Sequence, residues 1–321
     1  MVGLKELATA NKGIDLDQQR ALVAGGTQGI GAGIAERFAK AGAGVWIIGR
    51  NEQKANEVLA KLRQASAEYA TQNAKSTGSS SAQHEFFKAD LSDPKEMDRV
   101  TAEINKRAGK AGVDYLVECQ GGPPTGTFKP IGHSEFAFSV QCLSRFRIAE
   151  RLLQAGTIKQ GVLIVAVPGM GGKSLDVDDV DFRKKYDAGR WWGGPIGMAR
   201  MGLRDSAVLD CVAQSFAKKY PSQSFIHVAP GAVATEAPAN VGFPWPIPTL
   251  ARIFMPYIAR RPSDFAEMPF YLLANPEGKK LLRNGEVNGF GPWMGRQSVS
   301  ACAQDDALRD RLWDRLQGFF A

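Results

Sequence analysis

The chain has 321 residues, of which 44% are hydrophobic and 23% are charged, values typical of a globular protein. Its net charge is +7, but the basic residues are scattered among acidic ones without a dense basic stripe, so we expect no nucleic-acid partner. No apolar run approaches the length of about 18 residues that a membrane span needs. The N-terminus lacks a signal-peptide core, which predicts a cytoplasmic protein, and the four cysteines show no metal-site or disulfide spacing.

Short apolar runs alternate with longer amphipathic stretches along most of the chain. The apolar runs are typical of strands buried on both faces and cover residues 20–25, 45–49, 84–90, 113–121, 161–169 and 224–231. Stretches with helical spacing lie at 31–42, 51–70, 93–109, 135–156 and 201–220. Strands that alternate with helices form βαβ units. The sequence therefore predicts a single α/β domain over residues 1–321, with a Rossmann-type doubly wound parallel sheet of about seven strands.

A glycine-rich turn, AGGTQGIG, joins the first expected strand to the first expected helix. Glycines there let the backbone turn tightly and approach a pyrophosphate, which the free N–H groups and positive dipole end of the following helix would bind. The turn predicts a dinucleotide site, and a glycine turn kept for packing is the alternative. The contacts expected from this turn are Gly25, Thr27, Gln28, Gly29, Ile30 and Gly31.

The residues after the second expected strand indicate which dinucleotide binds. An acidic residue there would bind the ribose hydroxyls of NAD, whereas an arginine accommodates the 2′-phosphate of NADP. The sequence has Arg50 at this point, followed by Asn51. The pair favours NADP(H) as the cofactor, and a solvated loop arginine is the alternative.

These motifs resemble the short-chain dehydrogenase/reductase family over about residues 18–235. AGGTQGIG is similar to its TGxxxGIG loop, Asp90-Leu91 to its adenine-contacting pair, and APGAVATE at 229–236 to its PG-x-V-x-T segment. The chain looks especially similar to a divergent branch that is common in fungi. The resemblance implies a homodimer formed through the helices that flank the fourth and fifth strands. It also implies cofactor contacts from Asp90, Leu91, Gln120, Gly121, Pro230, Gly231, Val233 and Thr235.

The catalytic residues of that family are missing from the matching positions. Its tyrosine and lysine, spaced YxxxK, would fall at Met198 and Gly202, and the chain contains no YxxxK. Its serine aligns with Pro168 or Gly169, and its helix asparagine aligns with Gln141. A phenol with a pKa near 10 needs help to donate a proton near neutral pH. The resemblance therefore implies an atypical site without Ser-Tyr-Lys.

A segment at 172–195 is inserted before the expected catalytic helix. It contains KKYDAGRWWGG, in which Tyr186 precedes Arg190 by the spacing of the family's tyrosine and lysine. Tyr186, Arg190 and Asp187 are the candidate catalytic residues, with the tyrosine as a displaced proton donor. Arginine differs from lysine in geometry and proton chemistry, so the alternative is that Tyr186 is an ordinary loop or lid aromatic residue.

Aromatic residues gather in this inserted segment and in a proline-rich segment at 236–262. Both follow the carboxyl ends of strands, where ligands bind in open α/β sheets. We therefore expect a pocket for an apolar small molecule and a lid at 236–262, for which a membrane-surface helix is the alternative. The candidate substrate contacts are His133, Arg145, Trp191, Trp192, Phe243 and Trp245. For His133 the alternative is a structural role, and for Arg145 it is a solvated position.

Three functions remain open on this reasoning. The first is an NADP(H)-dependent reductase acting on an apolar small molecule, for example one of secondary metabolism, with a proton from a displaced acid or from water. The second is a non-redox isomerase, cyclase or dehydratase on the same scaffold, which the loss of Ser-Tyr-Lys favours. The third is a catalytically silent nucleotide-binding protein. The fold does not choose among them, because function depends on the site.

Overall fold

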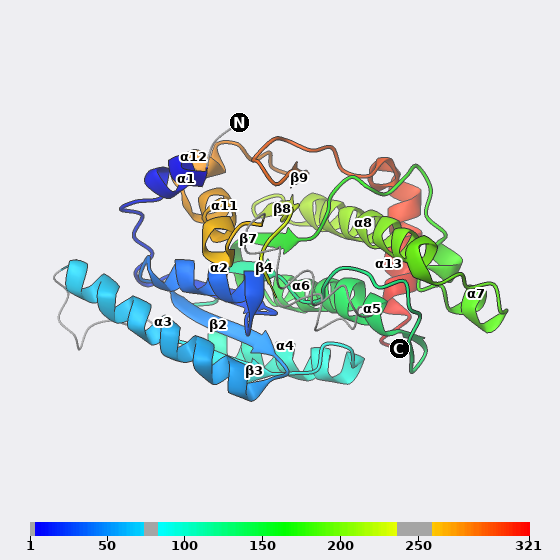
Figure 1. The fold of residues 1–321 in the computed structure, drawn as a ribbon, viewed down its shortest axis with the longest axis horizontal. Coiled ribbons are helices and arrows are strands. Elements are labelled where there is room, and N and C mark those ends of the chain that lie inside the picture. The colour runs from blue at the N-terminus through cyan, green and yellow to red at the C-terminus, as the bar shows by residue number, and fades with distance from the viewer. Residues whose placement is uncertain (1–3, 74–82, 236–258) are drawn as a thin grey trace.

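A seven-stranded parallel sheet forms the centre of the molecule (Figure 1). The computed structural model describes residues 4–73, 83–235 and 259–321, and every neighbouring pair of strands in this sheet is parallel. In spatial order the strands are β3 (Glu85–Lys88), β2 (Gly44–Gly49), β1 (Arg20–Ala24), β4 (Val113–Glu118), β7 (Ile158–Val165), β8 (Ser224–Val228) and β9 (Val287–Phe290). The chain order reverses beside β1, as in doubly wound sheets, and the predicted fold is confirmed.

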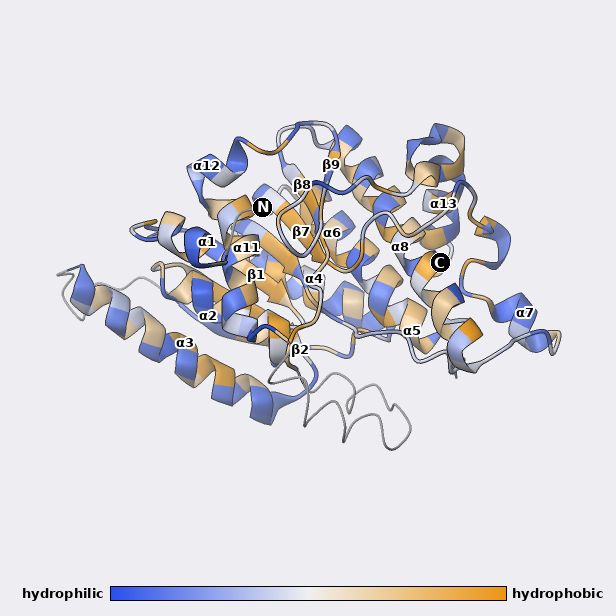
Figure 2. Cartoon of the chain, turned by 45° about the horizontal axis from the view of Figure 1, so that its top comes forward, coloured by the Kyte–Doolittle hydropathy of each residue, from blue (hydrophilic) through white to orange (hydrophobic). Residues whose placement is uncertain are grey.

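Helices cover both faces of the sheet. One face carries α1 (Leu4–Ala10), α2 (Gly29–Ala39), α3 (Glu52–Gln72) and α11 (Pro262–Ala274), and the other carries α4 (Pro94–Ala108), α6 (Ser144–Gln154), α8 (Gly194–Lys219) and α13 (Asp306–Gln317). Successive β1 side chains point to opposite faces, so Val23 enters the first core and Leu22 the second. Figure 2 shows the result, with apolar strands at the centre and hydrophilic residues on the outer sides of the helices.

Two expected helices differ from the prediction. The helix expected at 135–156 is divided into α5 (Phe136–Phe138), the π-helical turn η1 (Ser139–Leu143) and α6. The helix expected at 201–220 starts earlier, at Gly194, with a proline in its first turn, a position that proline favours. None of the helices in the described ranges has both the length and the apolar character to cross a membrane.

The remaining described elements are short and lie in the connections. A hairpin of β5 (Pro130–Ile131) and β6 (Ser134–Glu135) precedes α5. The inserted segment contains the 3-10 turn η2 (Val177–Asp179) and α7 (Arg183–Asp187). Near the C-terminus are α12 (Pro276–Lys279) and the 3-10 turn η3 (Ala301–Gln304). The inserted segment therefore has secondary structure of its own.

The C-terminal helix α13 packs on α6 and α8. The Trp313 ring meets the buried Phe146 ring edge-on, with centroids 4.9 Å apart, and the buried Phe216 ring with centroids 5.2 Å apart. Aromatic contacts of this geometry add to the free energy of burial. The helices through which the resemblance implies a homodimer are thus covered here by the chain's own C-terminal helix.

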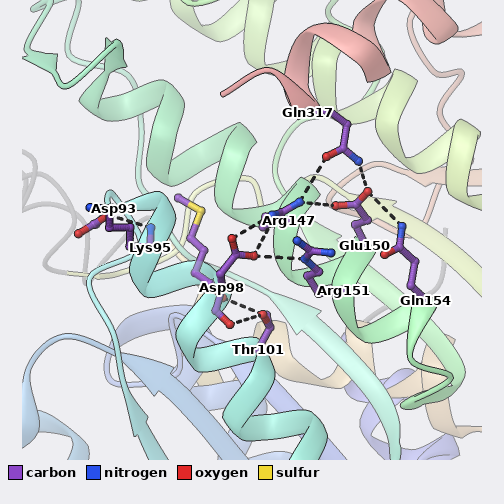
Figure 3. A network of polar contacts seen from close by, with 10 residues as sticks. Asp93, Lys95, Asp98, Thr101, Arg147, Glu150, Arg151, Gln154 and Gln317 are labelled. Carbon is purple, nitrogen blue, oxygen red and sulfur yellow. Dashed lines mark hydrogen bonds and ion pairs between the residues drawn. The ribbon is translucent and has the colours of Figure 1, made fainter. Parts of the chain in front are cut away.

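A polar network fastens α13 to α4 and α6 (Figure 3). Arg147 forms a bidentate ion pair with Asp98, with Nε–Oδ1 and Nη2–Oδ2 distances of 2.7 and 2.9 Å. Its Nη1 donates to Glu150 at 3.1 Å and to Gln317 of α13 at 3.3 Å. The Arg147 side chain is 6% exposed and that of Glu150 is 2% exposed. The charges of Arg147 and Glu150 therefore stabilise each other, because an unpaired charge is costly to bury.

Replacing Arg147 by alanine should lower the free energy of unfolding by about 3–5 kcal/mol, because Glu150 would become a buried carboxylate without its partner. Arg151 is the matched control. It pairs with the same Asp98 at 3.2 Å, but its side chain is 43% exposed, so Arg151→Ala should cost less than about 1 kcal/mol. Urea unfolding followed by circular dichroism measures both values. Equal losses in the two variants would contradict the role given to Arg147.

Candidate functional site

The glycine-rich turn between β1 and α2 brings backbone close to backbone. Gly25 has a φ of +75°, and a Cβ there would lie 2.6 Å from the backbone N of Gln120. A Cβ at Gly31 would lie 2.3 Å from the carbonyl O of Gly25. These two positions have no room for a side chain, so they require glycine. The turn leaves the N-terminus of α2 at the carboxyl end of β1, an arrangement that suits a pyrophosphate.

Two side chains near this helix N-terminus, those of Gln28 and Asn51, form hydrogen bonds within the fold. Gln28 precedes α2 and makes no side-chain capping bond; its Oε1 accepts a hydrogen bond from Lys54 Nζ at 2.6 Å. Asn51 caps α3, because its Oδ1 accepts from the backbone N of Lys54 at 3.0 Å. A side chain that caps a helix end in this way stabilises the helix. Asn51 therefore has a structural role whether or not it also meets a cofactor.

Arg50 and Asp90 lie at neighbouring strand exits beside the turn. Arg50 is exposed directly after β2, and β2 adjoins the turn because a Cβ at Gly49 would lie 2.5 Å from Thr27 Cγ2. Asp90 is exposed after β3, the strand paired with β2. Its Oδ1 accepts hydrogen bonds from the N and Oγ of Ser92 at 3.0 and 2.8 Å. The structure thus brings together the residues expected to hold the adenosine half of a dinucleotide.

The segment after β8 meets the same turn. A Cβ at Gly29 would lie 3.3 Å from Thr235 Cγ2, so the two predicted cofactor motifs are in contact although they are far apart in the sequence. Gly231 has a φ of +64°, a conformation that favours glycine. Of the other predicted contacts, Leu91 and Val233 are buried, whereas Ile30 and Pro230 are partly exposed.

The exit of β4 closes the opposite side of the turn. Gly121 has a φ of +103°, and a Cβ there would lie 2.5 Å from the Gln141 side chain, which donates from its Nε2 to the carbonyl O of Gly122. Gln141 belongs to the π-helical turn η1, and such turns are frequent at functional sites. Gln120 is buried, and its Nε2 donates to Ser144 Oγ at 3.1 Å. Its side chain therefore turns into the fold, and only its backbone adjoins the glycine-rich turn.

Arg145 lies inside the fold, which corrects the prediction that it contacts a substrate. The residue is 2% exposed, and its Nη2 donates to the carbonyl oxygens of Gln120 and Val165 at 2.7 and 3.1 Å. It thereby joins the exits of β4 and β7. Burial raises the pKa of the neighbouring Glu118 to about 8, although the charge of Arg145 opposes this shift. Helical spacing does not reveal such a residue, because arginine is seldom buried.

A buried carboxylate on α8 fixes the exits of β7 and β8. Asp210 Oδ2 accepts from the backbone N of Gly169 at 2.9 Å, and from the N and Oγ of Ser300 at 2.8 and 2.6 Å. Its Oδ1 lies 2.8 Å from Nδ1 of His227 in β8. Gly169 is one of the two positions that align with the family's serine, so the backbone at this position serves a structural purpose.

The first turns of α8 contain Met198 and Gly202, where the resemblance places the family's tyrosine and lysine. A Cβ at Gly126, in the loop after β4, would lie 2.2 Å from the carbonyl O of Gly194. A Cβ at Gly202 would lie 3.6 Å from Pro124, so position 202 faces the same loop but carries no side chain. Met198 is partly exposed, and α8 contains no tyrosine. Neither a phenol nor an ammonium group is present at these two positions.

The inserted segment packs against the loop after β4 through aromatic rings. Tyr186 of α7 stacks on Phe128, with centroids 4.2 Å apart and an angle of 13° between the planes. The Trp191 ring lies 5.7 Å from that of Phe128 and 5.4 Å from that of Phe182, and its Nε1 donates to the carbonyl O of Gly126 at 3.3 Å. Tyr186 and Trp191 therefore have structural contacts that the sequence did not reveal.

The three candidate catalytic residues do not form a group. Tyr186 contacts Phe128, whereas Asp187 pairs with Arg183 at 2.9 Å and Arg190 is exposed. The helix α7 ends at Asp187, so Arg190 does not lie one helical turn from Tyr186, and the predicted pairing is corrected. In Figure 1, α7 projects at the end of the molecule away from α2.

The predicted substrate contacts also differ in their placement. His133 is exposed in the turn between β5 and β6. Trp192 is 63% exposed just before α8. Phe243 and Trp245, with most of the lid predicted at 236–262, lie outside the described residues. Within the described ranges no group of three or more histidine, cysteine or acidic residues is arranged to hold a metal.

Several exposed apolar residues that the prediction missed follow strand ends or lie in the first turns of α8. Val167 and Met170 follow β7, Ile196 and Leu203 belong to the first turns of α8, and Trp293 follows β9; each is at least 40% exposed. Exposed apolar patches often mark ligand sites or interfaces. Their position after strand ends was a signal available in the sequence.

The comparisons with known proteins agree with this geometry. The model of the short chain dehydrogenase family matches residues 19–174, which include the glycine-rich turn, the exit of β2 with Arg50 and the exits of β4 and β7. Residues 19–174, slightly less than half of the chain, are therefore similar to the short-chain dehydrogenase family. The predicted resemblance is confirmed to this extent.

Two curated relatives of this chain come from Emericella. Oxidoreductase AN1596 of Emericella nidulans is 26% identical over 254 residues, which are 78% of this chain and 68% of that protein. Oxidoreductase andH of Emericella variicolor is 28% identical over 244 residues, which are 73% of this chain and 64% of that protein.

A solved structure shows the same fold. The short chain dehydrogenase from Burkholderia cenocepacia J2315, in complex with NADP, superposes with a TM-score of 0.57 at 18% identity and covers 86% of this chain and 98% of its own. At this level of identity, the likeness supports the architecture of the sheet and helices.

Asp210→Asn tests how strongly the shared carboxylate holds the site. Burial alone would raise the pKa of Asp210, but hydrogen bonds from His227 and Ser300 outweigh burial and hold the pKa below the ordinary value of an aspartate. A carboxyl group whose pKa is lowered by folding stabilises the native state above its unfolded pKa, and the contribution is lost as the pH falls through the folded pKa. We expect the variant to lose about 3 kcal/mol of unfolding free energy at neutral pH. In urea unfolding this difference should shrink below about pH 4; a constant difference would contradict the assignment.

Proposed function

We propose that this chain is an NADP(H)-dependent oxidoreductase that reduces a carbonyl group in an apolar small molecule, such as one of secondary metabolism. The observation that carries the proposal is the backbone cradle at Gly25 and Gly31, which leaves the N-terminus of α2 next to the carboxyl end of β1. Two relatives named oxidoreductases support it. A cytoplasmic location is part of the same proposal.

The described residues fit a bound NADP(H). The glycine-rich turn and the N-terminus of α2 would hold the pyrophosphate, and the exposed Arg50 would hold the 2′-phosphate. The segment 230–235, which touches the turn through Thr235 and Gly29, would hold the nicotinamide end. When bound, NADPH supplies a hydride to the carbonyl carbon and becomes NADP⁺. A structural neighbour was solved in complex with NADP, which supports this choice of cofactor.

The carbonyl oxygen must also take up a proton, and we propose that its source differs from the tyrosine of the resembled family. The tyrosine and lysine positions hold Met198 and Gly202, so the proton comes from a displaced acid or from water. Tyr186 is the leading candidate, because it is 39% exposed and is held by Phe128 beside the loop that adjoins the start of α8.

A non-redox isomerase, cyclase or dehydratase is the second candidate. The same observation favours it, since a site without a side chain at position 202 lacks the cation that would support a tyrosine. Such an enzyme would release a product of unchanged oxidation state and consume no NADPH. Product analysis by mass spectrometry distinguishes the two candidates.

Arg50→Glu should weaken NADPH binding about 10- to 100-fold, since a charge-assisted hydrogen bond to phosphate is worth about 1.5–3 kcal/mol. NADH binding should change far less, because NADH has no 2′-phosphate. Arg283→Glu is the control, as Arg283 is exposed and pairs only with Glu286 among the described residues, at 3.6 Å. Isothermal titration calorimetry gives each Kd. Equal losses for NADPH and NADH would remove Arg50 from the cofactor site.

Tyr186→Phe should lower kcat for carbonyl reduction by about 100-fold or more, because a positioned acid typically contributes that much. The phenylalanine ring keeps the stack on Phe128, so only the hydroxyl is lost. Tyr186→Ala removes both the ring and the hydroxyl, so it shows how much of the loss in kcat comes from the lost stacking on Phe128. Full turnover by the Tyr186→Phe variant would assign the proton to water.

A further inference from the structure

Trp293 stands on a tight turn at the end of β9. The backbone N of Gly291 donates to the carbonyl O of Gly295 at 2.8 Å, and that of Met294 donates to the carbonyl O of Gly291 at 3.1 Å. An antiparallel bridge between Phe290 and residue 296 closes the turn. These bonds fix the backbone on both sides of Trp293, yet the residue is 56% exposed.

Arg260 holds one face of the Trp293 ring. Its guanidinium carbon lies 3.7 Å from the ring centroid, which is within the range of a cation–π interaction. Its Nη1 also donates to the carbonyl O of Pro292 at 2.5 Å. The backbone of Arg260 is bonded in turn to Ala232 and Ala234 at 3.0 and 2.8 Å. The ring is thus anchored to the segment after β8.

The turn adjoins the expected nicotinamide end of the cofactor site. A Cβ at Gly231 would lie 2.9 Å from Pro292 Cβ, so Pro292 and the glycine of the PG-x-V-x-T segment are in contact. Trp293 follows Pro292 directly. The exposed ring therefore stands at the carboxyl edge of the sheet, beside the segment that we assign to the cofactor.

Trp293 differs from two other tryptophans, Trp46 and Trp192, in its combination of exposure and ring contacts. Trp46 also lies against an arginine, with Arg20 4.2 Å from its ring centroid, but it is 1% exposed and belongs to the core. Trp192 is 63% exposed, and within the described chain no ring or cation contact holds it. Trp293 combines an anchored ring with a large exposed area. A tryptophan kept only for packing would be buried, since its large apolar surface favours burial.

We propose that Trp293 is a stacking platform for a planar ring in the substrate, so that the site takes aromatic carbonyl compounds in preference to saturated ones of the same size. This inference rests on the proposed function for the identity of the ligand as a carbonyl compound. A ring stacked on the exposed tryptophan gains aromatic attraction beyond the area that it buries, and the anchored ring loses little freedom on binding. A saturated ring of equal size gains only the burial.

The test compares 1-tetralone, which contains a planar aromatic ring, with trans-1-decalone, which is saturated throughout. Isothermal titration of each ketone into the NADP⁺-loaded protein, which cannot reduce it, should show tighter binding of 1-tetralone. Trp293→Ala should weaken 1-tetralone binding about 3- to 10-fold and change the Kd of trans-1-decalone less than twofold. Trp293→Phe should keep most of the preference. Unchanged NADPH binding checks the fold of each variant.

The proposal is overturned if the wild-type protein shows no preference for 1-tetralone, or if Trp293→Ala affects both ketones equally or neither. A parallel assay of NADPH oxidation separates this result from the proposed function. Binding of 1-tetralone that depends on Trp293 but consumes no NADPH would support the platform and count against the oxidoreductase. Reduction of both ketones without dependence on Trp293 would do the reverse.

Discussion

The buried carboxylate of Asp210 determines how the carboxyl edge of the sheet is arranged. It collects hydrogen bonds from residues 17, 41 and 90 positions away in the chain, at His227, Gly169 and Ser300. A charge without solvent needs every one of these partners, so α8, the exits of β7 and β8 and the C-terminal segment take one relative position. The segment that carries Trp293 continues to Ser300, and Gly169, one of the two positions where the resemblance places the family's serine, is one of the bonded groups. The buried carboxylate of Asp210 thus helps to fix the geometry of the candidate site although it is not exposed to a ligand.

The fold and the cofactor motifs were predictable because they depend on local, periodic features. Strands buried on both faces must be apolar along their whole length, and a backbone that touches backbone at Gly25 and Gly31 permits only glycine. These constraints act residue by residue and are visible in a single sequence. The contact between Gly29 and Thr235 then follows from the topology, since both lie at carboxyl ends of strands in one sheet.

The remaining site was not predictable because it depends on which side chains are buried. Arg145 has a helical position that suits solvent equally well, and only its bonds to two strand exits show otherwise. Tyr186 and Arg190 have the spacing of the family's tyrosine and lysine, but α7 ends between them. Helix ends of this kind are the least certain part of any pattern. Trp293 was missed because its role depends on Arg260, a neighbour in space that lies in a different segment of the chain.

The bond between Arg147 and Gln317 has a consequence for how the molecule forms. The two residues are 170 positions apart in the chain. At a synthesis rate of about 5–20 residues per second, helix α13 is therefore completed about 10–30 s after helix α6, which it covers. During this time the Phe146 and Phe216 rings lack Trp313, and Arg147 and Glu150 lack their cover. A nascent chain in this state exposes the type of apolar surface that chaperones bind. The yield of folded protein in the cell is therefore expected to depend on how fast the ribosome passes through the second half of the message.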